Sequence, residues 1–133
     1  EAKVRGKKSV VIWGSGRAKR EFLYVDDLAE ACISVMELDV NVYQSLTKPQ
    51  QSFLNVGYGT DISILELCEV LKGVVDFNGE IIFDSKMPDG APRKLMDSSK
   101  IQSIGWKPTK TLKNGLHLAY ENYLKLYENK NDR

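Results

Sequence analysis

A short apolar run that ends in a glycine corner constrains the fold of this chain more than any other feature. Val10–Trp13 is a continuous apolar run, and Gly14 and Gly16 follow it directly. A run of this length bounded by glycine is typical of a buried strand. Beyond Val25 the apolar residues recur every three to four positions, which is the period of an amphipathic helix. The change of period predicts a strand, a turn and then a helix.

Strand and helix signals then alternate along the chain, which is the pattern of an α/β domain. Ser63 and Glu66 have the spacing of a capping box, and Asp27 and Glu30 share that spacing with Asp in place of Ser or Thr. We expect strands at Val10–Trp13, Ser52–Val56 and Glu80–Phe83, an extended piece at Arg20–Val25, a polar connection at 39–51, helices at Asp27 to about Leu38 and Ser63 to about Val75, a short helix near Ser98–Ile104, and a last helix after Thr111.

Composition excludes several classes of protein. The 133 residues carry 19 Lys+Arg against 18 Asp+Glu, a net charge of +1, which argues against a dedicated nucleic-acid binder. No apolar run reaches the roughly 20 residues of a membrane span, so no membrane partner is expected. Cys32 and Cys68 both fall in helical patterns and are expected to be free buried thiols, which favours a cytoplasmic setting. The single His117 cannot support a His-rich metal site.

Two familiar catalytic or cofactor patterns are absent. The glycine corner is not a dinucleotide fingerprint, because Lys19 stands where the third glycine belongs and Arg20–Val25 reads as extended. No serine lies in a nucleophile-elbow context near His117. The acidic pair Asp26 and Asp27 is explained by the preference for acids at a helix N-terminus.

Cations are the remaining polar signal. They lie after the corner and in the proline-containing loop that follows the third predicted strand: Arg17, Lys19, Arg20, Lys86, Arg93 and Lys94. Arginine matches phosphate oxygens with two parallel hydrogen bonds, and Trp13 offers a flat face to a base or sugar. Composition alone favours solvated surface loops over an anion site. The corner and this loop are expected to lie against each other.

Longer motifs carry a family resemblance. The chain resembles the GDP-L-fucose synthases, which are extended short-chain dehydrogenases/reductases, over nearly its whole length from Val10 to about Tyr127. The matching stretches are Val11–Gly16, Arg20–Ala29, Asn55–Gly59, Phe83–Asp84, Pro88–Asp97 and Ile104–Trp106. The resemblance implies a small C-terminal substrate domain with short strands and about three main helices, and it assigns residues 1–133 to that single domain. The charged start without Met is expected to be a cut within a longer chain, whose NADP-binding Rossmann half lies upstream.

The family converts GDP-4-keto-6-deoxy-D-mannose to GDP-L-fucose by epimerisation at C3 and C5 and an NADPH-dependent reduction at C4. Its catalytic residues lie in the upstream half, so none is assigned here, and the fragment is expected to be inactive and to bind no cofactor or metal. The parent is expected to be a homodimer whose contacts lie in the upstream half. The fragment without that half can therefore be a monomer.

The resemblance places substrate-binding roles on five residues. Trp13 would lie near the nucleotide and Arg20 at the diphosphate, with Asp89, Arg93 and Lys94 as a second set of contacts. Arg17 and Lys19 fall at unmatched positions and are left as surface charges. Two alternatives stay open: the substrate domain of another nucleotide-sugar epimerase or dehydratase, and an interaction module that binds no ligand.

Overall fold

The structure is a computed structural model that describes the backbone of residues 1–131 and the side chains of residues 1–127. It is a small mixed α/β arrangement of short strands and five helices, which confirms the predicted class. In chain order the described elements are β1 (Ser9–Trp13), β2 (Lys19–Glu21), α1 (Val25–Met36), α2 (Val40–Leu46), β3 (Asp61–Ser63), α3 (Ile64–Val74), β4 (Glu80–Asp84), β5 (Arg93–Lys94), α4 (Ser99–Ser103) and α5 (Leu112–Asn131).

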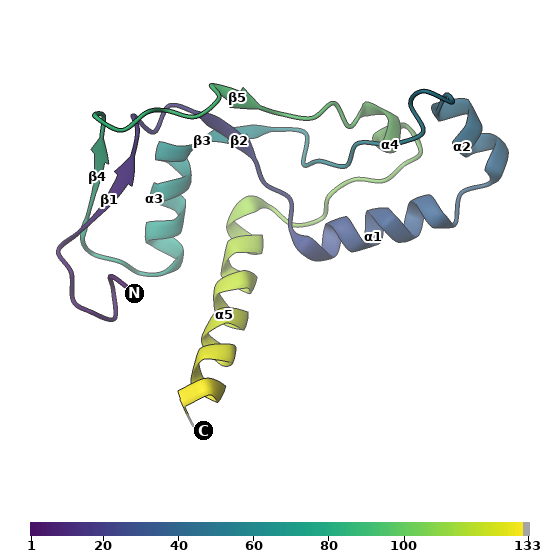
Figure 1. Ribbon diagram of the computed structural model, residues 1–133. Coiled ribbons are helices and arrows are strands. Elements are labelled where there is room, and N and C mark those ends of the chain that lie inside the picture. The colour runs from purple at the N-terminus through teal and green to yellow at the C-terminus, as the bar shows by residue number, and fades with distance from the viewer. Residues whose placement is uncertain (132–133) are drawn as a thin grey trace.

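The strands form two small sheets. β1 and β4 pair in parallel, with Ser9 opposite Glu80 at one end and Trp13 opposite Asp84 at the other. In the second sheet β2 is the central strand, antiparallel to β3 and parallel to β5. Figure 1 shows β1, β4 and α3 at one end of the molecule, the β3-β2-β5 sheet in the middle, and α1, α2 and α4 at the other end. The glycine corner connects the two sheets.

Helices α3 and α5 begin as the sequence predicts. The Ser63 hydroxyl accepts a hydrogen bond from the Glu66 backbone N–H at 3.2 Å, and the Ser63 N–H donates to the Glu66 carboxylate at 2.9 Å, so the capping box at α3 is confirmed. At α5 the Thr111 hydroxyl accepts from the Asn114 N–H at 3.3 Å. Both helices are therefore fixed at their first turn by local sequence.

The first helix differs from its prediction. α1 begins at Val25, its cap is Tyr24 without a side-chain hydrogen bond, and Asp27 lies inside the first turn, so the predicted capping box is wrong. Asp27 is turned inward instead, because its carboxylate is bound by a distant segment described below. The helical period predicts that Leu28, Ala31, Cys32, Val35 and Met36 form the buried side of this helix, and that prediction is wrong in part. Ala31 is buried and packs with Ile101 and Trp106, whereas Leu28, Cys32 and Met36 are exposed.

Two connecting segments also depart from expectation. Ser52–Val56 is not a strand: the backbone N–H groups of 53–56 donate to no described carbonyl, because no neighbouring strand lies beside them. β3 forms instead at Asp61–Ser63, where β2 supplies a partner. The predicted polar connection 39–51 contains α2, whose Asp39 cap accepts a hydrogen bond from the Asn41 N–H at 2.8 Å. Asp is one of the residues preferred at the start of a helix, so Asp39 was the available sequence signal for α2.

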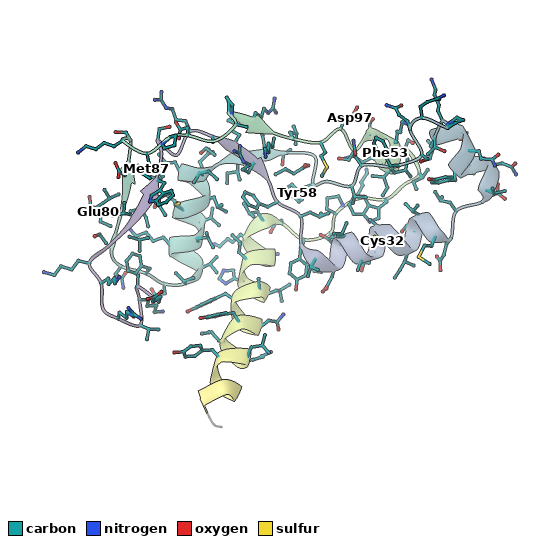
Figure 2. The ribbon with its side chains drawn as sticks, viewed as in Figure 1. Cys32, Phe53, Tyr58, Glu80, Met87 and Asp97 are labelled. Atoms are coloured by element: carbon teal, nitrogen blue, oxygen red, sulfur yellow. The ribbon has the colours of Figure 1, made fainter. Side chains whose placement is uncertain are left out.

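The cysteines lie in different surroundings. Cys68 is buried in α3 as predicted, but Cys32 is exposed, and Figure 2 shows its sulfur on the outer side of α1. Both thiols are free.

Candidate functional site

The glycine corner is held against the loop that follows β4. Both Asp89 oxygens accept hydrogen bonds from Ser15, one from its backbone N–H and one from its hydroxyl, each at 2.7 Å. Gly14 and Gly16 have φ of +84° and +75°, a backbone region that side chains disfavour. A Cβ at Gly14 would lie 2.4 Å from an Asp89 oxygen, and one at Gly16 would lie 2.5 Å from the Phe83 ring. The predicted contact between the corner and the second loop is therefore confirmed.

The Asp89 carboxylate is occupied by its hydrogen bonds to Ser15. The hydrogen bonds from the Ser15 side chain and backbone, helped by the nearby charge of Arg17, lower the pKa of Asp89 below its usual value. The group is thus ionised at neutral pH and holds the corner in place. This is a local role, distinct from the ligand contact that the resemblance implies.

The register of the three-stranded sheet sorts the predicted cations between its two faces. Residues that are partners in neighbouring strands point to the same face, and successive residues in one strand point to opposite faces. Arg20 is opposite Lys94, so these two side chains share one face. Arg93 is opposite Lys19 and shares the other face with it. The structure therefore brings Arg20 and Lys94 together and separates Arg93 from them.

Arg20 and Lys94 form no ion pair with any described carboxylate. The Arg20 guanidinium donates one bond to the Lys19 carbonyl at 2.6 Å, and its other terminal nitrogen lies against Gly90, where a Cβ would be 3.2 Å away. Lys94 is exposed. Two neighbouring cations without carboxylate partners are an arrangement that attracts an anion.

Trp13 lies at the end of β1, next to the corner. Its side chain is 72% exposed, which is unusual for the largest apolar side chain in a small domain. An exposed aromatic face beside the glycine corner can stack against a planar or apolar ligand group.

Arg93 is committed to an ion pair. Its Nε donates to the Asp61 carboxylate, whose side chain is only 8% exposed, while the Arg93 side chain is 62% exposed. This hydrogen bond, with the charges of Arg93 and Lys19, lowers the pKa of Asp61. The same pair raises the pKa of Arg93.

Two carboxylates of structural importance were not identified as such from the sequence. Glu21 accepts from the backbone N–H of Gly59 at 2.7 Å and of Met96 at 3.2 Å, so it connects β2 to the segments on either side. Its only sequence signal is its place in the matching stretch Arg20–Ala29. Asp27 accepts from the backbone N–H groups of Thr109 and Lys110, so it connects α1 to the segment before α5.

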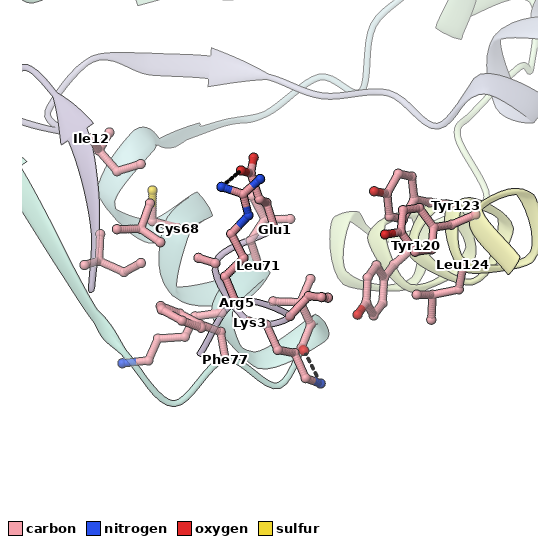
Figure 3. A pocket seen from close by; sticks show the side chains of 17 residues that line it. Glu1, Lys3, Arg5, Ile12, Cys68, Leu71, Phe77, Tyr120, Tyr123 and Leu124 are labelled. Carbon is pink, nitrogen blue, oxygen red and sulfur yellow. Dashed lines mark hydrogen bonds and ion pairs between the residues drawn. The ribbon is translucent and has the colours of Figure 1, made fainter. Parts of the chain in front are cut away.

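A separate apolar groove lies between α5 and the β1/α3 end of the molecule. Its volume is about 540 Å³, and Figure 3 shows Tyr120, Tyr123 and Leu124 of α5 facing Ile12, Cys68, Leu71 and Phe77 across it. The predicted site residues do not line it. These α5 side chains form an apolar side of the helix that, in the described residues, is only partly covered.

Metal-binding groups and membrane-spanning helices were both sought among the described residues. No group of three or more His, Cys, Asp and Glu side chains among them is placed to hold a metal ion. Within the same residues, no helix has the length and apolar character that crossing a bilayer requires.

Comparisons with known proteins bear on the motifs described above. The family model of the NAD dependent epimerase/dehydratase family matches residues 2–46. GDP-L-fucose synthase 1 of Arabidopsis thaliana is 47% identical over 125 residues, which is 94% of this chain and 36% of the relative. GDP-L-fucose synthase of Escherichia coli is 44% identical over 124 residues, 93% of this chain and 39% of the relative.

Among solved structures, a GDP-D-glycero-L-gluco-heptose synthase from Campylobacter jejuni, determined in the presence of NADPH, superposes with a TM-score of 0.76. It is 42% identical, and the match covers 87% of this chain and 33% of that one. The chain thus spans a little over a third of the length of the curated relatives it matches. These relatives confirm the resemblance to a partial region of GDP-L-fucose synthases.

Proposed function

We propose that this chain is the GDP-sugar-binding part of an NADP-dependent epimerase and reductase of the GDP-L-fucose synthase type. In this proposal Arg20 and Lys94 hold the diphosphate, Trp13 lies against the nucleotide, and Asp89 keeps the corner in the shape that presents them. The observation that carries it is the pairing of Arg20 with Lys94 on one face, without carboxylate partners, beside an exposed Trp13. Relatives that carry the name GDP-L-fucose synthase support the choice of ligand.

The proposal includes a second part of the enzyme that carries the chemistry. NADPH and the catalytic residues belong to an upstream Rossmann domain, so residues 1–133 alone should neither turn over substrate nor bind the cofactor. Two exposed apolar surfaces support a covering partner of this kind. One is the groove beside α5. The other is the side of α1 that presents Val25, Leu28, Cys32, Ile33 and Met36, the last of them 84% exposed.

The whole enzyme is proposed to be a cytoplasmic homodimer. Free thiols and the absence of a membrane-spanning helix in the described residues fit this setting. The dimer contacts are assigned to the Rossmann part.

Calorimetric titration with GDP, with UDP and ADP as controls, tests the binding claim. GDP is expected to bind the folded chain weakly, because half of the cleft is lacking and affinity depends on preorganisation. Arg20→Ala and Lys94→Ala should each weaken GDP binding by about tenfold, as expected when one charge-assisted contact is lost. Lys48→Ala, which removes one exposed cation away from the sheet, should leave it unchanged. Equal and negligible heats for all three nucleotides in a folded sample would contradict the proposal.

A second candidate is the substrate domain of another nucleotide-sugar enzyme. The observation in its favour is the 42% identity to a GDP-heptose synthase structure. The two candidates share GDP but differ in the sugar. In a full-length enzyme, Trp13→Ala should change nucleotide preference if Trp13 lies against the nucleotide. Turnover of GDP-4-keto-6-deoxy-D-mannose against heptose substrates distinguishes the two classes.

The remaining alternative, a ligand-free interaction module, makes a different prediction for the apolar surfaces. A module that is complete by itself should be a clean monomer that binds no hydrophobic dye. A part of a larger enzyme should self-associate and bind dye through the groove and the α1 surface. Light scattering over a concentration series measures this difference.

A further inference from the structure

β5 is the least supported strand of the three-stranded sheet. It has two residues, Arg93 and Lys94, and lies at the edge, with β2 as its partner. A backbone hydrogen bond from the Lys19 N–H to the Pro92 carbonyl, at 2.8 Å, fixes its beginning. Strands usually have at least three residues, and a ladder of only two residue pairs with β2 offers few backbone hydrogen bonds to β5. Its position therefore needs further support.

The Arg93 side chain supplies a connection across the sheet. Arg93 belongs to β5 and Asp61 belongs to β3, so their ion pair spans the central strand β2, a separation of two strand spacings of about 4.8 Å each. The Asp61 side chain is 8% exposed and the Arg93 side chain 62%, so the pair is covered at its Asp61 end and open to solvent at its Arg93 end. The pair ties the weak edge strand to the far side of the sheet.

The same connection determines where Lys94 points. Arg93 and Lys94 are successive residues, so fixing Arg93 on the face of Asp61 turns Lys94 to the opposite face, beside Arg20. Like charges directly opposite each other repel and destabilise a strand pair. An edge strand free to move would separate Lys94 from Arg20 in the absence of an anion. The Asp61–Arg93 pair opposes that separation.

We infer that Arg93 and Asp61 are positioning residues: their ion pair holds β5 so that Lys94 stays beside Arg20 as a preformed anion site. This inference rests on the proposed function, since it names the device that prepares the same site. Arg93 then acts on the ligand through Lys94 and does not itself bind it.

A charge exchange separates positioning from direct contact. Arg93→Gln is expected to weaken GDP binding about tenfold, close to the loss from Lys94→Ala. The double variant Asp61→Arg/Arg93→Asp restores an ion pair across the sheet and should return the affinity for GDP to within about threefold of the native chain. If Arg93 touches the ligand directly, the exchanged pair will bind as weakly as Arg93→Gln, and the inference is overturned.

The coupling between substitutions at Arg93 and Lys94 is a second test, because a general loss of stability would not change it. Lys94→Ala should weaken GDP binding about tenfold in the native and exchanged backgrounds but about twofold or less in Arg93→Gln. Equal effects of Lys94→Ala in all three backgrounds would show that Lys94 does not depend on Arg93, against the inference.

Hydrogen exchange tests the device without any ligand. The Lys19 amide, which is bonded to the Pro92 carbonyl, should exchange at least several-fold faster in Arg93→Gln and recover in the exchanged pair. The Leu65 amide, bonded to the Gly16 carbonyl, is the internal control and should not change. If the native chain fails to bind GDP, the proposed function fails, but the Lys19 amide still decides the inference. Unchanged exchange at Lys19 in Arg93→Gln overturns it.

Discussion

Replacing Asp27 by alanine is expected to destabilise the fold by about 3 kcal/mol. The Asp27 side chain is 2% exposed, and its carboxylate accepts hydrogen bonds from the Thr109 N–H at 3.1 Å, the Thr109 hydroxyl at 2.6 Å and the Lys110 N–H at 3.0 Å. A hydrogen bond to a charged group contributes about 1.5–3 kcal/mol, and three bonds to one carboxylate are not additive. The change also leaves the donors at 109 and 110 without an acceptor. For a chain of this length the melting temperature should fall by about 10 °C.

Urea unfolding followed by circular dichroism measures this change, and Asp26→Ala is the matched control. Asp26 lies in the same first turn of α1 but is exposed, so its replacement removes a similar interaction with the helix dipole and no buried hydrogen bond. Asp26→Ala should cost about 0.5 kcal/mol. If the two variants lose similar stability, the helix dipole explains both carboxylates and the connection from Asp27 to residues 109–110 contributes nothing.

The pH dependence provides an independent check on Asp27. Burial raises the pKa of Asp27, but the hydrogen bonds from the Thr109 side chain and from the Lys110 and Thr109 backbones outweigh burial, so its pKa lies below the usual 3.8. A carboxyl group whose pKa is lowered on folding stabilises the protein above the unfolded-state pKa, and that stabilisation is lost as pH falls through the folded-state pKa. The stability difference between the native chain and Asp27→Ala should therefore be constant near neutral pH and shrink below about pH 4. A difference that grows on acidification would refute the sign.

Other substitutions test the local geometry. Gly16→Ala should destabilise the fold by at least about 2 kcal/mol, because Gly16 has a positive φ and lies against the Phe83 ring. Gly73→Ala should stabilise it by about 0.5–1 kcal/mol, because Gly73 lies in α3 with open space around it. Thermal melts of the two variants compare them directly. Removing the capping hydroxyl with Ser63→Ala should cost about 1 kcal/mol in urea unfolding, and no loss would refute the capping role. Cys32 should react rapidly with a thiol reagent and Cys68 slowly, since burial and then Glu69 raise the pKa of Cys68; equal rates would contradict the structure.

The sequence predicted the parts of the fold that depend on near neighbours. The Ser63–Glu66 capping box needs only a hydrogen bond three residues away, and it is present. The predicted Val10–Trp13 strand also forms, because β4 supplies a partner for it. The Ser52–Val56 segment has equally good strand character but lacks a partner strand, so its ladder does not form among the described residues. Strand formation depends on distant pairing, which a single sequence does not display.

For the candidate site, the sequence by itself determined which residue types are present, and the family resemblance pointed to five of them. Only the tertiary structure decided how they are grouped. Register puts Lys94 beside Arg20 and turns Arg93 to Asp61, and Asp89 binds Ser15 across 74 positions of the chain. The physical reason is that a cation beside a carboxylate forms an ion pair with it, whereas a cation without one is free to bind a ligand. The distance from each cation to a carboxylate is set by strand pairing between segments far apart in sequence.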